Sequence, residues 1–194
     1  MTDICKENFF FFEKDCSNLK LKPDSLEHAY LAILNDDLDT ALLIFKHLDS
    51  SRASWGEILT EILRDGHMQK MPTFFQIRNF FEIDVDFLIK NEKIDYVEQL
   101  LGALELFSTI NQESYKFAAR VMYENRLYSA SFRYMEESKK IYYNDPELHF
   151  MYAKYYYESR KYKDAYFYIN ECLRLLPSYY PALILKEKIE EFYI

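Results

Sequence analysis

The chain has 194 residues and a formal net charge of −8, and hydrophobic residues occupy 49% of its positions. This apolar content excludes a disordered tail and is enough for one domain core or a short repeat protein. Three scattered glycines cannot form the phosphate-binding loops of nucleotide-binding folds, and without a clustered basic stripe we expect no nucleic-acid partner.

The N-terminal segment, residues 1–21, contains four consecutive phenylalanines at positions 9–12. Four exposed phenylalanines would be an aggregation hazard, so we expect this segment to cap the first helices. The alternative is that it enters a groove of its own chain, or of a second chain in a homodimer.

The cysteines and the apolar runs predict a location. Cys5, Cys16 and Cys172 are odd in number and widely spaced, which is typical of a reducing compartment. The N-terminus is too acidic, and its apolar run too short, for a secretory signal. No run approaches the ~18 apolar residues that cross a bilayer. We therefore expect a cytoplasmic protein without membrane insertion.

The first predicted helical pair covers Asp24–Leu48, where apolar residues recur every three or four positions. The polar run Asn35–Asp37 interrupts this pattern and predicts a turn. Asp24 and Glu27 have the spacing of a capping box for the first helix.

Two further helical pairs follow along the chain. Ala53–Arg64 and Thr73–Phe81 form a degenerate pair, joined by the segment DGHMQKMP. Ile83–Phe107 forms a second pair that turns at Asn91–Lys93. Long stretches of strict alternation are absent from the sequence, so the predicted fold class is all-α.

The C-terminal part of the chain repeats itself. When residues 112–145 are aligned with residues 146–179, a shift of 34, eight positions are identical without a gap. The motif YExRxY at 123–128 falls on the same motif at 157–162. Each unit has the pattern of a helix, a short turn at Asn125 or Ser159, and a second helix.

This 34-residue unit resembles the tetratricopeptide repeat (TPR) family, most clearly over residues 112–194. The family has large, small, aromatic, small, large and proline residues at positions 4, 8, 11, 20, 24 and 32. In the two units these positions hold Tyr115, Ala119, Met122, Ser131, Met135 and Tyr143, and then His149, Ala153, Tyr156, Ala165, Ile169 and Pro177. His149 and Tyr143 depart from the pattern.

The resemblance implies helix-turn-helix repeats stacked into a right-handed α-solenoid over residues 22–194. The expected units are 22–51, 52–77, 78–111, 112–145 and 146–179, followed by a capping helix at 180–194. Ala29 and Ala41 have the spacing of the two small positions, whereas Val85 and Val97 replace that pair in the third unit.

Tyrosine is concentrated in Met151–Ile169, where seven of nineteen residues are tyrosine. Aromatic residues at helical spacing usually belong to a core, so we interpret most of this cluster as packing. Only Tyr157 has a register position that faces the inner surface of a superhelix.

The resemblance also implies a concave groove formed by positions 2, 5, 9, 12 and 13 of each first helix. These positions hold Glu113, Lys116, Arg120, Tyr123 and Glu124, and then Glu147, Phe150, Lys154, Tyr157 and Glu158. Within this set, the predicted partner-binding residues are Lys116, Arg120, Tyr123, Phe150, Lys154 and Tyr157. We expect this basic and aromatic path to bind a protein or peptide with an acidic segment or a C-terminal carboxylate.

The simpler interpretation of the same residues is local charge pairing. Arg120 and Glu124 are four residues apart, as are Lys154 and Glu158, and such exposed pairs contribute only about 0.3–0.5 kcal/mol. The carboxylate clamp of chaperone-binding family members is incomplete here, so a receptor for chaperone tails is not supported.

Catalytic and metal sites find little support in the sequence. The four histidines, His28, His47, His67 and His149, lack neighbouring ligands, and Cys172 has a packing position. The paired acids Asp84/Asp86 and Glu136/Glu137 are typical of solvated helix faces. We expect a non-enzymatic adaptor or chaperone-like interaction module without cofactor or metal, the alternative being a structural protein that self-associates.

Overall fold

The computed structural model describes residues 24–193 and contains eleven helices and no strand within that range. The predicted all-α class is therefore confirmed for this part of the chain. The predicted capping segment, its phenylalanines 9–12, Cys5 and Cys16 lie outside the described residues.

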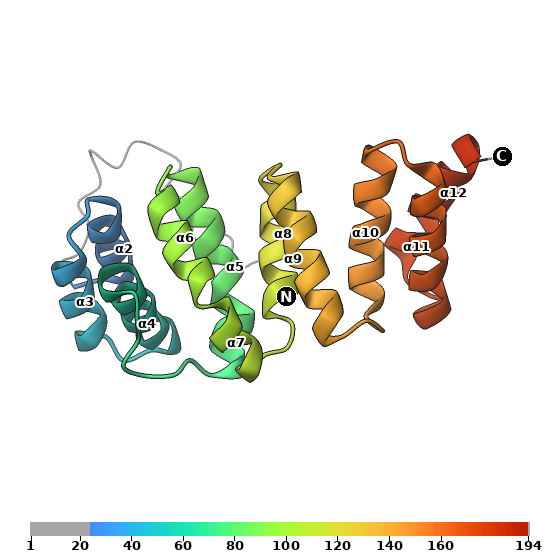
Figure 1. Ribbon diagram of the computed structural model, residues 1–194. Coiled ribbons are helices and arrows are strands. Elements are labelled where there is room, and N and C mark those ends of the chain that lie inside the picture. The colour runs from blue at the N-terminus through green and yellow to red at the C-terminus, as the bar shows by residue number, and fades with distance from the viewer. Residues whose placement is uncertain (1–23, 194) are drawn as a thin grey trace.

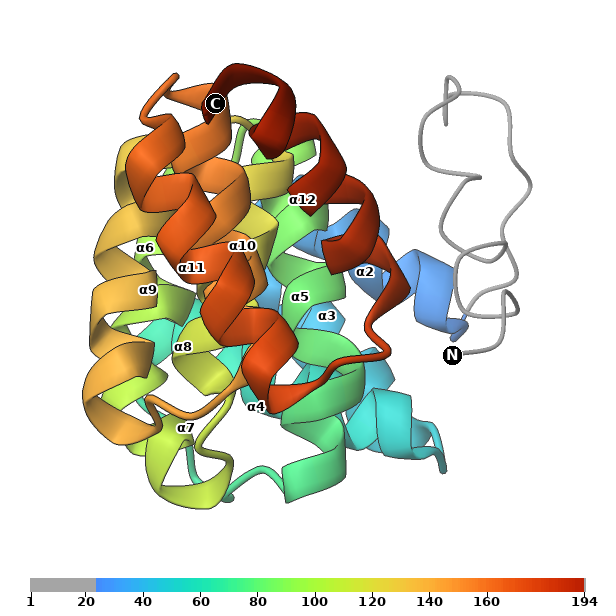
Figure 2. The ribbon, with the colours of Figure 1, turned by 90° about the vertical axis from the view of Figure 1, so that its right-hand side faces the viewer.

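Consecutive helices pack against one another, in chain order, from α2 and α3 at one end to α11 and α12 at the other (Figure 1). Seen from the end formed by α11 and α12, α12 lies beside α10 and α11 (Figure 2). The helices are α2 (Leu26–Leu34), α3 (Leu38–His47), α4 (Ser51–Asp65), α5 (Phe74–Lys90), α6 (Ile94–Gly102), α7 (Leu104–Ile110), α8 (Ser114–Glu124), α9 (Tyr128–Ile141), α10 (Pro146–Glu158), α11 (Tyr162–Leu175) and α12 (Tyr180–Tyr193).

The turns α2–α3, α5–α6, α8–α9 and α10–α11 share one backbone geometry. In each, a non-glycine residue adopts the left-handed conformation: Asp36, Glu92, Arg126 and Arg160 have φ between 57° and 62°. The next amide donates back to the carbonyl five residues earlier at 2.8–2.9 Å, as Leu127 does to Met122. This is the Schellman arrangement that ends a helix. The left-handed residues at 92, 126 and 160 are 34 positions apart, so the spacing found at the C-terminus extends to the pair α5–α6.

The middle of the chain differs from the prediction in its helix boundaries. The expected helix Thr73–Phe81 and the first helix of the next pair form one continuous helix, α5, so the boundary drawn at 77/78 falls inside it. A capping box between Thr73 and Gln76 starts this helix, and no glycine or proline interrupts it. The expected second helix is instead divided into α6 and α7 next to Gly102.

The cap of the first helix is also corrected. The side chain of Ser25, not of Asp24, accepts the amide of His28 at 3.2 Å and is the N-cap of α2. Asp24 precedes this position and has a φ of 62°. The predicted end helix at 180–193 is confirmed as α12.

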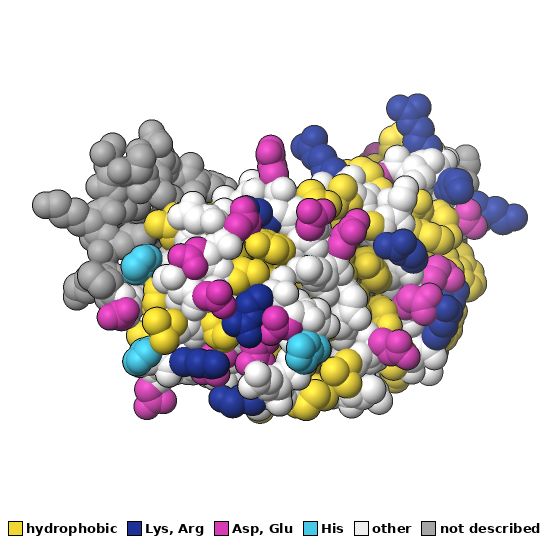
Figure 3. Space-filling model, turned by 60° about the vertical axis from the view of Figure 1, so that its left-hand side comes forward, with side chains coloured by type: hydrophobic (Ala, Val, Ile, Leu, Met, Phe, Trp, Pro, Cys, Tyr) yellow, Lys and Arg dark blue, Asp and Glu magenta, His cyan; other side chains and the backbone are white. Residues whose placement is uncertain are grey.

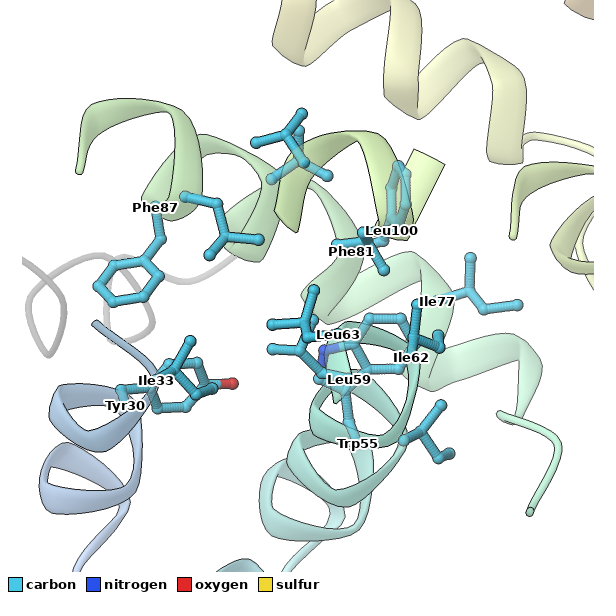
Figure 4. Packing of buried hydrophobic residues seen from close by; sticks show 14 of the residues in the cluster. Tyr30, Ile33, Trp55, Leu59, Ile62, Leu63, Ile77, Phe81, Phe87 and Leu100 are labelled. Atoms are coloured by element: carbon cyan, nitrogen blue, oxygen red, sulfur yellow. The ribbon is translucent and has the colours of Figure 1, made fainter. Parts of the chain in front are cut away.

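The core of the N-terminal half centres on Trp55, which is fully buried on α4 (Figure 4). Phe81 of α5 meets Phe107 of α7 edge to face with ring centroids 5.9 Å apart. Tyr30 of α2 makes the same kind of contact with Phe45 of α3 at 5.3 Å. Aromatic side chains of α2, α3, α4, α5 and α7 therefore belong to one core.

The helix pairs of the C-terminal half approach closely at small residues. Ala119, Ser131, Ala153 and Ala165 have no exposed surface, as their repeat positions predict. The tyrosines of α10 and α11 pack around them: the rings of Tyr152, Tyr156 and Tyr168 stack with centroids 4.7–6.4 Å apart. The interpretation of most of this tyrosine cluster as packing is confirmed.

Gly56 on α4 offers a test of the contact between α3 and α4. A Cβ atom on Gly56 would lie 2.4 Å from Cε1 of the buried Phe45 ring. Replacing a mid-helix glycine by alanine usually gains about 1 kcal/mol, but overpacking a core costs about 1–3 kcal/mol. We expect Gly56→Ala to lower the free energy of unfolding, measured by urea denaturation.

The matched control is Gly102→Ala, because a Cβ atom there meets no heavy atom within 4 Å. We expect this variant to be as stable as the natural chain or slightly more stable. Equal stability of the Gly56→Ala and Gly102→Ala variants would contradict the close approach of α3 and α4.

Candidate functional site

Four of the six predicted partner-binding residues line one pocket between α8 and α10. Arg120 and Tyr123 come from α8, and Phe150 and Lys154 come from α10. The pocket has a volume of about 220 Å³. Its remaining lining residues are Glu124, Glu147, Met151 and Tyr179.

The sequence positions of these residues explain why they converge. Arg120 and Glu124 are one helical turn apart on α8, and Phe150 and Lys154 are one turn apart on α10, so each pair shares a helix face. Tyr179, just before α12, approaches the Phe150 ring edge to face at 5.3 Å. Sequence reasoning did not assign Tyr179 to the site, because it lies at the end of its repeat unit and not on a first helix.

Lys116 is placed below this surface, with only 3% of its side chain exposed. Its ammonium group contacts the carboxylates of Glu113 at 2.8 Å, Asp145 at 2.5 Å and Glu147 at 3.1 Å. Burial opposes the charge, but the hydrogen bonds to Asp145 and Glu113 raise the pKa of Lys116. Asp145 in turn caps α10 by accepting the amides of Glu147 and Leu148. Lys116 therefore joins α8 to the start of α10, and its side chain is buried among acidic partners.

Arg120 is also held by carboxylates of other helices. Its guanidinium binds Glu82 of α5 through two hydrogen bonds of 2.6 and 2.8 Å, and it also contacts Glu147 of α10. Burial raises the pKa of the Glu82 carboxyl, while Arg120 acts in the opposite direction. These contacts replace the expected local pair with Glu124. Arg120 thus links α5, α8 and α10 and also lines the pocket.

Lys154 is placed differently from the other two cations. Its ammonium lies 4.5 Å from the centroid of the Tyr123 ring, a cation–π contact across the pocket. Burial and the nearby Glu158 raise the pKa of the Tyr123 hydroxyl. Tyr157, predicted to face the groove, packs against Tyr162 and Phe192, with centroids 5.9 and 6.3 Å away, and does not line the pocket.

The predicted basic path is acidic in sum. The cations are Lys116, Arg120 and Lys154, and carboxylates surround them and the Tyr123 hydroxyl. These carboxylates are Glu82, Glu113, Glu124, Asp145, Glu147 and Glu158. Around the predicted path three positive groups thus lie near six negative ones, a formal balance of −3, whereas the pocket lining alone holds two cations and two carboxylates. Register positions in the repeat predict these cations, but carboxylates from α5 and from the cap of α10 neutralise two of them, Arg120 and Lys116.

Other candidate sites can be placed as well. Cys172 is fully buried, and burial raises the pKa of its thiol to about 11, so it is a core residue as expected. Among residues 24–193, no group of three or more His, Cys, Asp and Glu side chains is arranged to hold a metal ion. No helix in this range is long and apolar enough to cross a membrane. On the face drawn in Figure 3, acidic and basic described side chains are interspersed.

Comparisons of the chain with protein-family models, curated proteins and solved structures found no match.

Proposed function

We propose that the chain is a non-catalytic protein-interaction module of TPR-like architecture, a right-handed α-solenoid that holds a segment of a partner protein in the pocket between α8 and α10. The observation that carries the proposal is the convergence of Arg120, Tyr123, Phe150 and Lys154 on one open, aromatic pocket. The two helices that form it occupy equivalent places in consecutive 34-residue units. Pockets of this kind, between stacked repeats, suit an extended segment or helix.

The regular turn spacing and the end helix support the architecture. The fully buried Ala119 and Ala153 have Glu187 as their counterpart 34 residues further on, on α12. Glu187 is exposed. A charged side chain at the position where helices of a unit approach most closely disfavours another helix there. This supports the role of α12 as the cap of the solenoid.

A cytoplasmic adaptor or scaffold role is part of the proposal. It is supported by the buried, unpaired thiol of Cys172, which suits a reducing compartment.

The proposal is tested by selection from a displayed library of random dodecapeptides on the full chain. Affinities of the enriched peptides are then measured by fluorescence anisotropy. Phe150→Ala removes the aromatic wall next to Tyr179, and we expect it to weaken binding about tenfold or more, as anchor residues do. The control is Phe167→Ala on α11, since Phe167 is 54% exposed and lies outside the pocket lining.

Both variants are first compared with the natural chain by circular dichroism and thermal melting, and Tyr179→Ala serves as a second pocket variant. The proposal would be contradicted if the peptides bound the natural chain and the two pocket variants equally well. A selection that enriches no peptide would also contradict it.

A further inference from the structure

The charges around the pocket identify the chemistry of the segment it accepts. This inference rests on the proposed function and deepens it. The pocket contains aromatic faces and carboxylates together: Tyr123, Phe150 and Tyr179 line it beside Glu124 and Glu147. Aromatic faces with nearby carboxylates form a favourable environment for an ammonium or guanidinium group.

The cations of the pocket do not offer a free site for an anion. Arg120 already has two carboxylate partners, Glu82 and Glu147, so an incoming carboxylate would compete with both. Lys116 is buried beneath the pocket behind its own acidic partners. An anionic residue would also approach Glu124, which is exposed at the rim. The carboxylate of Glu124 would repel a negative charge bound beside it.

Lys154 shows how a cation sits in this environment. Its ammonium lies over the Tyr123 ring, while its counterpart on the other helix, Arg120, is held by carboxylates. A lysine of the protein itself thus occupies one aromatic face that a cation of a partner could use. The remaining faces, Phe150 and Tyr179, lie beside Glu147 and lack a cation–π contact within the described part of the chain.

We propose that the pocket between α8 and α10 accepts a basic side chain, arginine or lysine, of the docked segment, in place of the acidic segment or terminal carboxylate expected from the sequence. Charge supports this choice. The lining holds two cations and two carboxylates, but Arg120 is paired with Glu82 and Glu147, and Lys154 lies over the Tyr123 ring. Glu124 has no ion-pair partner among the described residues, so it is available to a cation of the docked segment.

Two substitutions with opposite expected signs test this inference on peptides enriched from the dodecapeptide library. Glu124→Gln removes a rim carboxylate without changing its shape, and we expect about two- to fivefold weaker binding. Lys154→Gln removes the competing cation from the Tyr123 ring, and we expect about two- to fivefold tighter binding. An acidic ligand would give the reverse of both signs.

The controls are Glu187→Gln and Lys188→Gln, which make the same changes of net charge on the exposed face of α12. They separate a local effect from the general attraction of basic peptides to an acidic protein. We expect both controls to leave affinity within about 1.5-fold at 150 mM salt, near physiological ionic strength.

The outcomes separate the inference from the proposed function. The inference is supported by peptides that depend on Phe150 and are rich in arginine or lysine. Replacing the arginine or lysine of such a peptide by norleucine should weaken its binding. Acidic peptides that depend on Phe150 would overturn the inference and leave the proposed function intact. Peptides without any dependence on Phe150 would overturn both.

Discussion

Replacing Asp84 by asparagine is expected to lower the free energy of unfolding by about 3 kcal/mol or more. Asp84 on α5 has no exposed surface and accepts hydrogen bonds from three side chains. Arg52 donates twice, at 2.5 and 3.1 Å, the Trp55 indole donates at 2.5 Å, and the Tyr30 hydroxyl donates at 3.3 Å. Removing the negative charge weakens the hydrogen bonds from Arg52, the Trp55 indole and the Tyr30 hydroxyl together.

The surroundings of Arg52 make this loss costly. Its guanidinium carbon lies 4.8 Å from the ring centroids of both Tyr30 and Phe80, so aromatic rings and not water surround much of the group. Burial raises the pKa of the Asp84 carboxyl, while Arg52 opposes that change. Changing one partner of a buried pair is more destabilising than changing one of an exposed pair, because water does not reach the Asp84 side chain to replace the weakened contacts.

Urea denaturation of the full chain measures the effect, with Asp39→Asn as the matched control. Asp39 also pairs with an arginine, Arg64, at 2.9 Å, but 86% of its side chain is exposed. An exposed pair contributes at most about 1 kcal/mol, so the control should stay close to the natural stability. Equal losses in the two variants would show that the Asp84 network contributes no more than a surface pair. In the double variant Arg52→Met/Asp84→Leu, part of the lost stability should return.

The burial of Asp84 is a feature that could not be predicted from the sequence. The sequence predicts a solvated helix face for both Asp84 and Asp86, which is wrong for the buried Asp84. Asp86 is paired with Lys90 at 2.9 Å on the surface of the same helix. The two residues differ because α5 packs against α4, α6 and α8, so more than one of its sides is covered. A single helix pattern cannot show which polar residue faces a buried donor on another helix.

The features that the sequence predicted well depend on neighbouring residues or on the repeat itself. The turns at Asn35–Asp37 and Asn91–Lys93, the small residues Ala119 and Ala153, and the end helix at 180–193 are of this kind. The pocket was predicted in part, because repeat register brings residues of α8 and α10 together. Its charge balance was not, since the pairing of Glu82 with Arg120 joins residues 38 positions apart. Such pairing depends on how whole helices stack.

Replacing Lys116 by methionine is the second substitution with a large expected effect, a loss of about 3 kcal/mol in unfolding free energy. Methionine keeps much of the buried stem but removes the ammonium that contacts Glu113, Asp145 and Glu147. These carboxylates would then repel one another at the start of α10, where Asp145 is the N-cap. The loss corresponds to a fall of about 6–12 °C in Tm for a chain of this size.

Lys154→Met is the control, because it removes a lysine of the same site that has a cation–π contact where Lys116 has its ion pairs. We expect it to lower stability by no more than about 1 kcal/mol. If the two variants lost equal stability, Lys116 would be an ordinary groove lysine and its place as a buried link between α8 and α10 would be wrong. The expected difference also decides which residues can report on binding. A substitution of Lys116 would weaken the binding of a partner by destabilising the site. Substitutions of Lys154 and Glu124 change the charge of the pocket while the fold stays intact.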